Sequence, residues 1–464
     1  MSLRRRLSSG FGATAYGRAV SLLGQLAMVP VLLHSWGAAT YGAWLTLTSL
    51  AAYLSQTSLG LIPAARSDMA MAYGRDDRSG VLETFQTALL FIFLSSTLGG
   101  LAFVAVILNT PVLSGLTVLP ISHGAALLIM EVLTLQIVVS LQSGVIYGGL
   151  SALGHYGFAH ALDATRQLAD LLAVAVLVLV FRAPPEVAVL AYAVTSVSAM
   201  AVGLWVLRRA APWLRVGARH ASWSVLQRLW RPMLGGLALS FGYSGLVVQA
   251  PRLILAATSG PVSVAVFSLA AMLLRMIRMV QEMVVFPVGI EMARAFGTGD
   301  FPLAKRLLLV TSSLSFWMFL IAGPMIVLAG PWFIHLWTAG AVTPSRSLIA
   351  LLVVAGLLSS LSMPAQQALL SINRLIAASV SLVLVSIPTL LLSFVLSQSF
   401  GAVGMAVGLC LLEGAFLVAL IFRVSRWFDL SLVEYARAHA APPIGMLWAE
   451  VSRVFRRLSP RGET

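Results

Sequence analysis

The chain has 464 residues, of which 59% are hydrophobic and only 10% are charged, and its net charge is +14. In soluble proteins about a quarter of all residues are charged. The 30 basic and 16 acidic side chains of this chain therefore cannot form a water-facing shell around it. The composition therefore excludes a soluble enzyme and a nucleic-acid-binding domain, and it indicates a membrane protein.

Apolar segments of about 20 residues, the length that crosses a bilayer, recur twelve times. Their ranges are 14–33, 42–63, 85–108, 124–147, 164–181, 187–207, 234–257, 262–288, 307–329, 347–370, 376–397 and 401–422. The sequence thus predicts an all-α, polytopic membrane protein with about twelve transmembrane helices.

Basic residues lie almost entirely on one side of this predicted arrangement. Twenty-four of the 30 cations fall on the side that also holds both termini, and only Arg182 and Arg346 lie in the opposite loops. Cytoplasmic loops carry the excess of Lys and Arg in membrane proteins. We therefore expect both termini to be cytoplasmic.

An internal repeat divides the twelve spans into two halves. Residues 68–77 resemble residues 291–300 at a constant offset of 223, and the same offset relates Gly100 to Gly323. Six helices per half is an even number, so the repeats are expected to be parallel six-helix bundles around a central cavity. The predicted parts are an N-terminal bundle (1–207), a basic cytoplasmic linker (208–233), a C-terminal bundle (234–423) and a basic cytoplasmic tail (424–464).

No pattern for catalysis or metal binding accompanies these spans. Cys410 is the only cysteine, and the only lysine, Lys305, does not follow the glycine-rich loop of a phosphate-binding P-loop. His155 and His160 are five residues apart, whereas metal ligands on a helix are three or four apart, so we interpret them as interfacial residues. The sequence predicts no catalytic residue, no metal and no cofactor.

Charged side chains inside a membrane are costly, and they usually face a cavity or one another. The cations within the predicted spans are Arg18, Arg252, Arg275 and Arg278, and the acids are Glu131, Asp170, Glu282 and Glu413. Structural pairing inside the bundle is one interpretation of these residues. For Arg18 and Arg252, which lie near span ends, snorkelling to the interface is another.

The eighth predicted span carries three charges on one face, because Arg275, Arg278 and Glu282 are spaced i, i+3 and i+7. Arg278 and Glu282 are expected to pair, and Arg275 lies near the middle of the span. A guanidinium offers a fork of N–H donors that suits a diphosphate. An ion pair of Arg275 with Glu131 or Glu413 is the alternative. The candidate substrate-binding residues are Arg275, Arg278, Arg18 and Arg252.

Intramembrane carboxylates are candidates for coupling transport to H⁺ or Na⁺, because a desolvated carboxylate can exchange its charge for a proton. The candidates are Glu131, Asp170 and Glu282. Asp170 lies four residues after Arg166, so structural pairing is favoured for this residue.

Short motifs near both ends of the chain carry a family resemblance. They are Pro30-Val31-Leu32-Leu33, Gly37, Tyr41-Gly42-Ala43-Trp44, Leu59-Gly60-Leu61, Met69–Asp77 and Gly401–Gly408. Together they resemble polysaccharide-export (Wzx-type) flippases of the multidrug/oligosaccharidyl-lipid/polysaccharide exporter superfamily, with a twelve-helix layout over the whole chain. Ser58 stands where that family often has an acid, which removes one ion-coupling candidate. The resemblance implies flipping of a polyprenyl-diphosphate-linked oligosaccharide across the bacterial inner membrane for surface polysaccharide assembly.

The last part of the chain combines helix packing with a basic tail. Gly404 and Gly408 form a small-xxx-small pair, which favours close packing within the half over homodimerisation. From Ile444 to Leu458, apolar residues recur at helical spacing with arginines on the opposite side. This pattern is typical of a helix that lies on anionic membrane lipids. Docking of a cytoplasmic partner, such as a polysaccharide assembly protein, is the alternative.

Two other functions compete with a flippase. A cation-coupled multidrug antiporter of the same superfamily would favour acidic clusters in the first half and a less basic cavity. An integral-membrane polysaccharide polymerase would usually need a substantial outer loop, and the longest predicted outer loop, 330–346, has 17 residues.

Overall fold

The computed structural model describes all residues except 1–2, 59, 110–119, 372–374 and 441–464. The predicted tail helix lies outside the described residues. Within the described part of the chain every regular element is helical. The elements are α1 (Leu3–Ala52), η1 (Tyr53–Ser58), α2 (Leu61–Gly74), α3 (Arg78–Asn109), α5 (His123–Leu150), η2 (Ser151–His155), α6 (Tyr156–Leu179), α7 (Pro185–Ala188), α8 (Leu190–Ala210), α9 (Trp223–Ser240), η3 (Phe241–Gln249), α10 (Ala250–Gly297), α11 (Phe301–Trp337), α12 (Arg346–Ser371), α13 (Leu375–Phe428) and α14 (Leu432–Ala438).

Eight continuous helical runs are long and apolar enough to cross a membrane. Four of them have 51 to 59 residues, which is far more than the roughly 20 that one crossing needs. Each of these four contains a glycine with a positive φ, at Gly37, Gly154, Gly260 or Gly401, where the helix direction breaks. Four runs with two crossings and four with one give about twelve spans, which confirms the predicted all-α membrane fold.

The helices extend beyond the apolar segments that predicted them. α9 begins at Trp223, eleven residues before the predicted span, and α11 ends at Trp337, eight residues after it. The added turns are helical but more polar, so hydropathy alone places the span and not the helix ends.

The chain folds into two compact units. Unit 1 comprises 1–266 with 335–342, and unit 2 comprises 267–334 with 343–464, so the chain passes from one unit to the other within α10. The predicted bundle boundaries at 207 and 234 stay predictions.

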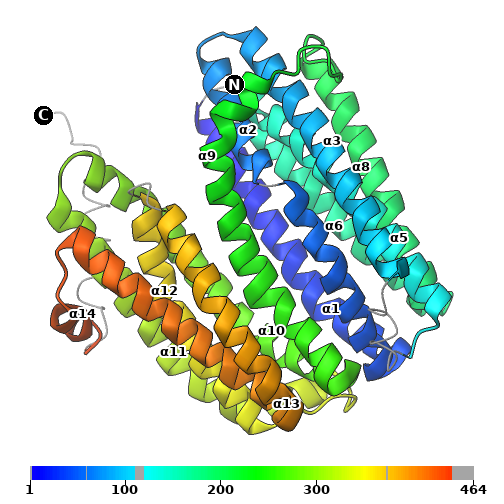
Figure 1. The fold of residues 1–464 in the computed structure, drawn as a ribbon, viewed down its shortest axis with the longest axis vertical. Helices are drawn as coiled ribbons and strands as arrows, with labels where there is room; N and C mark the ends of the chain where they lie inside the picture. Colours follow the sequence, from blue (N-terminus) through cyan, green and yellow to red (C-terminus); the bar gives the residue numbers. More distant parts are fainter. Residues whose placement is uncertain (1–2, 59, 110–119, 372–374, 441–464) are drawn as a thin grey trace, which may run out of the picture. The chain divides into compact units, whose positions relative to one another are not determined.

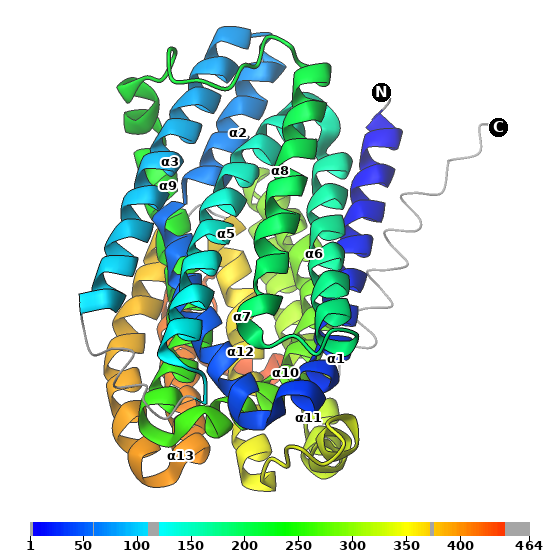
Figure 2. The same ribbon diagram turned by 90° about the vertical axis from the view of Figure 1, so that its right-hand side faces the viewer.

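Unit 1 is a bundle in which α1 packs along α6, α5 along α8, and α2 along α3 (Figure 1). Its largest apolar core lies between α2, α3 and α5, where Met69, Phe85 and Leu150 are fully buried. A second cluster around Trp44 and Ile129 joins α1 to α5. Figure 2 shows these helices from a second direction.

In unit 2, α12 packs along α13. The two parts of α13 on either side of Gly401 approach closely, because a Cβ at Gly404 would lie 2.2 Å from the Leu396 carbonyl oxygen and one at Gly408 would lie 1.8 Å from Ser393 Oγ. The glycine pair therefore serves close packing within the half, as predicted.

The structure reproduces the sequence repeat in backbone detail. Gly37 (φ 78°, ψ 166°) and Gly260 (φ 79°, ψ 174°) form the same bend at the offset of 223. At the end of the repeated segment, Asp77 Oδ1 accepts a hydrogen bond from Gly80 N–H at 2.9 Å, and Asp300 Oδ1 accepts one from Leu303 N–H at 3.1 Å. Each aspartate thus caps the next long helix at equivalent positions. Chance similarity of Ala/Gly-rich sequence would not produce the same turn and the same cap.

Candidate functional site

A cavity of about 230 Å³ lies inside unit 1, where α2, α5 and α6 meet. Its polar lining residues are Arg66 from α2, Ser140, Ser143 and Tyr147 from α5, Ser151 from η2, and His160, Asp163 and Arg166 from α6. Hydroxyls and guanidinium groups outnumber the single carboxylate. The lining is therefore rich in hydrogen-bond donors and carries net positive charge.

Two glycines allow α2 and α5 to approach each other at this cavity. A Cβ at Gly144 would lie 3.0 Å from Ile62 Cδ1, and one at Gly148 would lie 3.5 Å from Arg66 Cβ. Gly144 and Gly148 are spaced i, i+4 and lie on one face of α5, which is the small-residue pattern of close membrane helix contacts. The sequence analysis did not use this spacing, which is the one local signal that could have pointed to the cavity.

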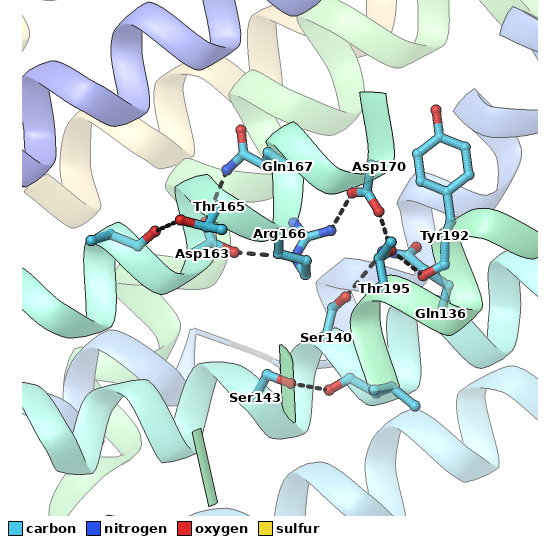
Figure 3. Close-up of polar contacts among 12 residues, drawn as sticks. Gln136, Ser140, Ser143, Asp163, Thr165, Arg166, Gln167, Asp170, Tyr192 and Thr195 are labelled. Carbon is cyan, nitrogen blue, oxygen red and sulfur yellow. Dashed lines mark hydrogen bonds and ion pairs between the residues drawn. The ribbon is translucent and has the colours of Figure 1, made fainter. Parts of the chain in front are cut away.

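A chain of ion pairs and hydrogen bonds forms one wall of the cavity (Figure 3). Arg166 Nε lies 3.3 Å from Asp163 Oδ1, and Arg166 Nη1 lies 2.6 Å from Asp170 Oδ2. Thr195, on α8, donates a hydrogen bond to Asp170 Oδ1. The network holds the Arg166 side chain in one orientation and links α6 to α8.

Arg66 differs from Arg166 in its surroundings. Its side chain is exposed, and within the described ranges of the chain no carboxylate forms an ion pair with it. Arg166, in contrast, is shared between two acids. An anionic group that enters the cavity would meet the Arg66 guanidinium together with serine and tyrosine hydroxyls, and guanidinium binds phosphate with paired N–H donors.

The predicted pairing of Asp170 with Arg166 is confirmed. Asp170 is buried and has Thr195 as its second partner. Of the other predicted coupling residues, Glu131 is exposed on α5, whereas Glu282 forms an ion pair on α10.

The eighth span shows the expected pairing as well. Arg278 Nε lies 3.5 Å from Glu282 Oε1, and Arg278 Nη1 donates to Ser359 Oγ of α12 at 3.2 Å. The carboxyl of Glu413 on α13 is buried and within electrostatic range of Arg278. Arg278 therefore belongs to a polar cluster of unit 2 that joins α10, α12 and α13, and Glu413 lies close to Arg278.

The remaining predicted substrate-binding residues are partly buried. Arg252 Nη1 donates to Gln249 Oε1 at 3.3 Å and to Ser49 Oγ at 3.5 Å within unit 1. Arg18, on α1, and Arg275, on α10, are half-buried and have polar or electrostatic partners. Their role as diphosphate ligands stays a prediction.

The sequence analysis missed the two arginines of the cavity. Arg66 and Arg166 lie at the ends of predicted spans that were expected to face the cytoplasm, where they counted as evidence for topology. Because α2 and α6 continue as helices past the apolar segments, both side chains lie within a helical bundle instead of in loops.

Comparison with solved structures places this fold. An inward-facing multidrug resistance MATE family transporter of the MOP superfamily superposes with a TM-score of 0.68 at 15% identity, over 93% of this chain and 97% of that one. The lipid II flippase MurJ, in an inward closed conformation, superposes with a TM-score of 0.71 at 10% identity, over 96% and 92%. The chain has the fold of MOP-superfamily transporters.

A third structure with the MOP fold is a transporter from Pyrococcus furiosus whose binding pocket has reversed polarity. It superposes with a TM-score of 0.60 at 15% identity, over 94% of this chain and 96% of that one. No protein-family model and no curated protein matches this sequence. The evidence for the MOP fold is therefore structural.

Proposed function

We propose that this protein is a MOP-superfamily transporter that flips a polyprenyl-diphosphate-linked oligosaccharide from the cytoplasmic to the outer leaflet of the bacterial inner membrane, for surface polysaccharide assembly. Its termini are cytoplasmic in this proposal, and it carries out no covalent chemistry. Support comes from the fold, from the Wzx-type motifs, and from the cationic cavity in unit 1.

The observation that carries the proposal is the Arg66 guanidinium at a donor-rich cavity. A diphosphate presents several anionic oxygens, which bind best to forked N–H donors supported by hydroxyls. Cationic drugs would instead need free carboxylates or several aromatic faces. The one carboxylate of the cavity lining, Asp163, is engaged by Arg166, and the aromatic rings of the lining are those of Tyr147 and His160. The charge of the cavity therefore favours an anionic substrate.

Arg275, Arg278, Arg18 and Arg252 are proposed as further ligands of the diphosphate during its passage. In an alternating-access cycle the headgroup passes between donor sets, and each set has to bind it weakly enough to release it. Coupling to H⁺ or Na⁺ through Asp170, Glu131 or Glu282 is proposed as the energy source.

A transport assay tests this function. The full chain is reconstituted in proteoliposomes with a fluorescent polyprenyl-diphosphate oligosaccharide, and the fraction that becomes accessible to an impermeant reagent is followed over time. We expect Arg66→Ala to slow flipping at least about tenfold and Arg66→Lys to recover part of it, because the charge remains while the fork is lost. Arg346→Ala, in an exposed position at the start of α12, is the matched control.

Two results would contradict the proposal. Wild-type protein that leaves the labelled lipid in its original leaflet would exclude it as a flippase for that lipid class. An unchanged rate in Arg66→Ala would remove the cavity from the pathway even if flipping occurs.

A cation-coupled multidrug antiporter is the second candidate, because Asp170 is buried in the first half of a chain whose structural neighbours include multidrug resistance transporters. Efflux of a fluorescent cationic drug that collapses in Asp170→Asn, with no flipping of the diphosphate lipid, would favour this candidate.

A further inference from the structure

A second recess lies on the outside of unit 1, between α3 and the start of α9. It is a groove of about 280 Å³, and its walls include Leu90, Phe91 and Leu94 from α3 and Trp223 and Leu226 from α9. Thr87 lies at one end of the α3 wall. Leu94 lies seven residues further along the helix, which is a distance of about 10 Å along the helix axis at 1.5 Å per residue. The groove is therefore long, narrow and apolar.

The segment that closes this groove is fixed to α3 by buried polar side chains. Gln86 donates from Nε2 to the Arg215 carbonyl oxygen at 3.0 Å and accepts from His220 N–H at 2.7 Å. Thr87 Oγ1 accepts from Ser222 N–H at 2.9 Å. Because these bonds hold the backbone of 215–222 against α3, the groove is formed in advance and does not depend on an occupant.

The wider region from Arg208 to Arg231, which contains this segment, is strongly basic. Six arginines lie between Arg208 and Arg231, and no acidic residue occurs between Glu186 and Glu282. Arg228 is neutralised by Asp68, whereas Arg215 and Arg219 lie within the segment 215–222 and are exposed. The segment that bounds the apolar groove thus carries exposed positive charge.

Two exposed tryptophans lie on α9 beside the groove. α9 buries Val225 and Leu229 against unit 1, whereas Trp223 is 71% exposed and Trp230 is 55% exposed on an adjacent face. An indole with an apolar body and an N–H donor is favoured at the headgroup level of a bilayer. A surface that binds a soluble protein would not need the exposed tryptophans of α9 to continue into the apolar side of α3.

We propose that this groove is a binding site for an anionic phospholipid. One acyl chain lies along Leu90, Leu94 and Leu226, and the phosphate headgroup lies against Arg215 and Arg219. The apolar walls account for the chain, the arginines account for the preference for an anionic headgroup, and the fixed backbone of 215–222 accounts for a defined position. This site is independent of the transported substrate.

Photolabelling of the full chain tests the proposal. The protein is reconstituted in vesicles with a trace of phosphatidylglycerol that carries a photoreactive group in one acyl chain, or with phosphatidylcholine that carries the same chain. Labelled peptides are then mapped by mass spectrometry. We expect phosphatidylglycerol to label 87–94 and 221–226 several-fold more than phosphatidylcholine does.

Substitutions separate charge from shape. R215Q/R219Q should lower labelling by phosphatidylglycerol roughly thirtyfold, as expected for two interfacial cations. The matched control R182Q/R346Q removes two exposed charges from predicted outer loops and should leave labelling unchanged. Leu90→Trp should fill the groove and reduce labelling by both lipids there.

Equal labelling by the two lipids, or phosphatidylglycerol labelling that persists in R215Q/R219Q, would overturn the proposal. If R215Q/R219Q fails to fold, the ratio between the two lipids on the wild-type protein and the effect of Leu90→Trp decide the outcome. Capture of a protein on the groove with equal lipid labelling would also count against it.

Discussion

Replacing Asp68 by alanine removes the acceptor of a buried network that holds α9 to α2 and α3. Asp68 accepts hydrogen bonds from Arg228 Nη2 at 2.8 Å, from Arg228 Nε at 3.2 Å and from Thr84 Oγ1 at 2.7 Å. Thr84 is fully buried and Asp68 is 7% exposed. The substitution therefore leaves a buried hydroxyl and a guanidinium without their acceptor.

The loss in the free energy of unfolding depends on how exposed Asp68 and Arg228 are. Breaking a fully buried ion pair costs about 3–5 kcal/mol, but the Arg228 side chain is 53% exposed, so water replaces part of what it loses. We expect Asp68→Ala to lower the free energy of unfolding by about 2 kcal/mol, which corresponds to roughly 4 °C in Tm. Arg228→Ala should cost at least as much, because it leaves the buried carboxylate without a cation.

A double-mutant cycle on the detergent-solubilised full chain measures this coupling. Thermal unfolding is followed for Asp68→Ala, Arg228→Ala and the double variant, with Arg231→Ala as the exposed control on the same helix. Because each single change already breaks the pair, the double variant should be at least about 1 kcal/mol more stable than the sum of the single effects. Additive effects within about 0.5 kcal/mol would refute the interpretation of these contacts as an energetic unit.

Four further predictions follow from the contacts described above. Arg275→Ala should abolish glycan export with a near-normal Tm, and Arg275→Lys should restore part of it. A large drop in Tm that a second Glu131→Gln or Glu413→Gln change reverses would make the residue structural. Gly148→Leu should close the cavity, because the added side chain would collide with α2. We expect this change to slow flipping strongly and to change Tm only slightly. Asp77→Ala and Asp300→Ala should each lower Tm by a small and similar amount as lost caps, and unequal effects in thermal unfolding would weaken their equivalence. Burial lowers the pKa of His439 below its ordinary value of 6.5, so its neutral form stabilises docking of α14 above that pH. The hydrogen-exchange protection factors of 432–438 should therefore fall as the pH falls below it, and His439→Leu should remove this dependence.

Protonation of His439 should weaken the docking of α14. A histidine whose pKa is lowered in the folded state binds its proton less tightly there than in the undocked chain, so protonation favours undocking. His439 lies against Ser312, 3.2 Å from Nε2, and against the Tyr435 carbonyl oxygen, 2.7 Å from Nδ1. Protection factors of the 432–438 amides, corrected for the intrinsic exchange rate at each pH, that stay constant between pH 7.5 and pH 5 would contradict this account.

Local features of the sequence were sufficient to predict much of the structure. Apolar length placed the spans, and the offset of 223 found a repeat that extends to the bend at Gly37 and Gly260. Pairs on one helix were predictable too, because the spacing i, i+4 brings Arg166 to Asp170 whatever the rest of the chain does.

Contacts between helices were decided only by the tertiary structure. Asp68 and Arg228 are 160 residues apart, and Arg66 and Arg166 come from different helices to line one cavity. In a soluble helix the apolar face shows which side is buried, but lipid is as apolar as the protein interior, so the hydrophobic pattern of a spanning helix does not specify its rotation or its neighbours. Small residues such as Gly144 permit a close contact, but which helix fills the space depends on how all the surfaces of unit 1 pack together.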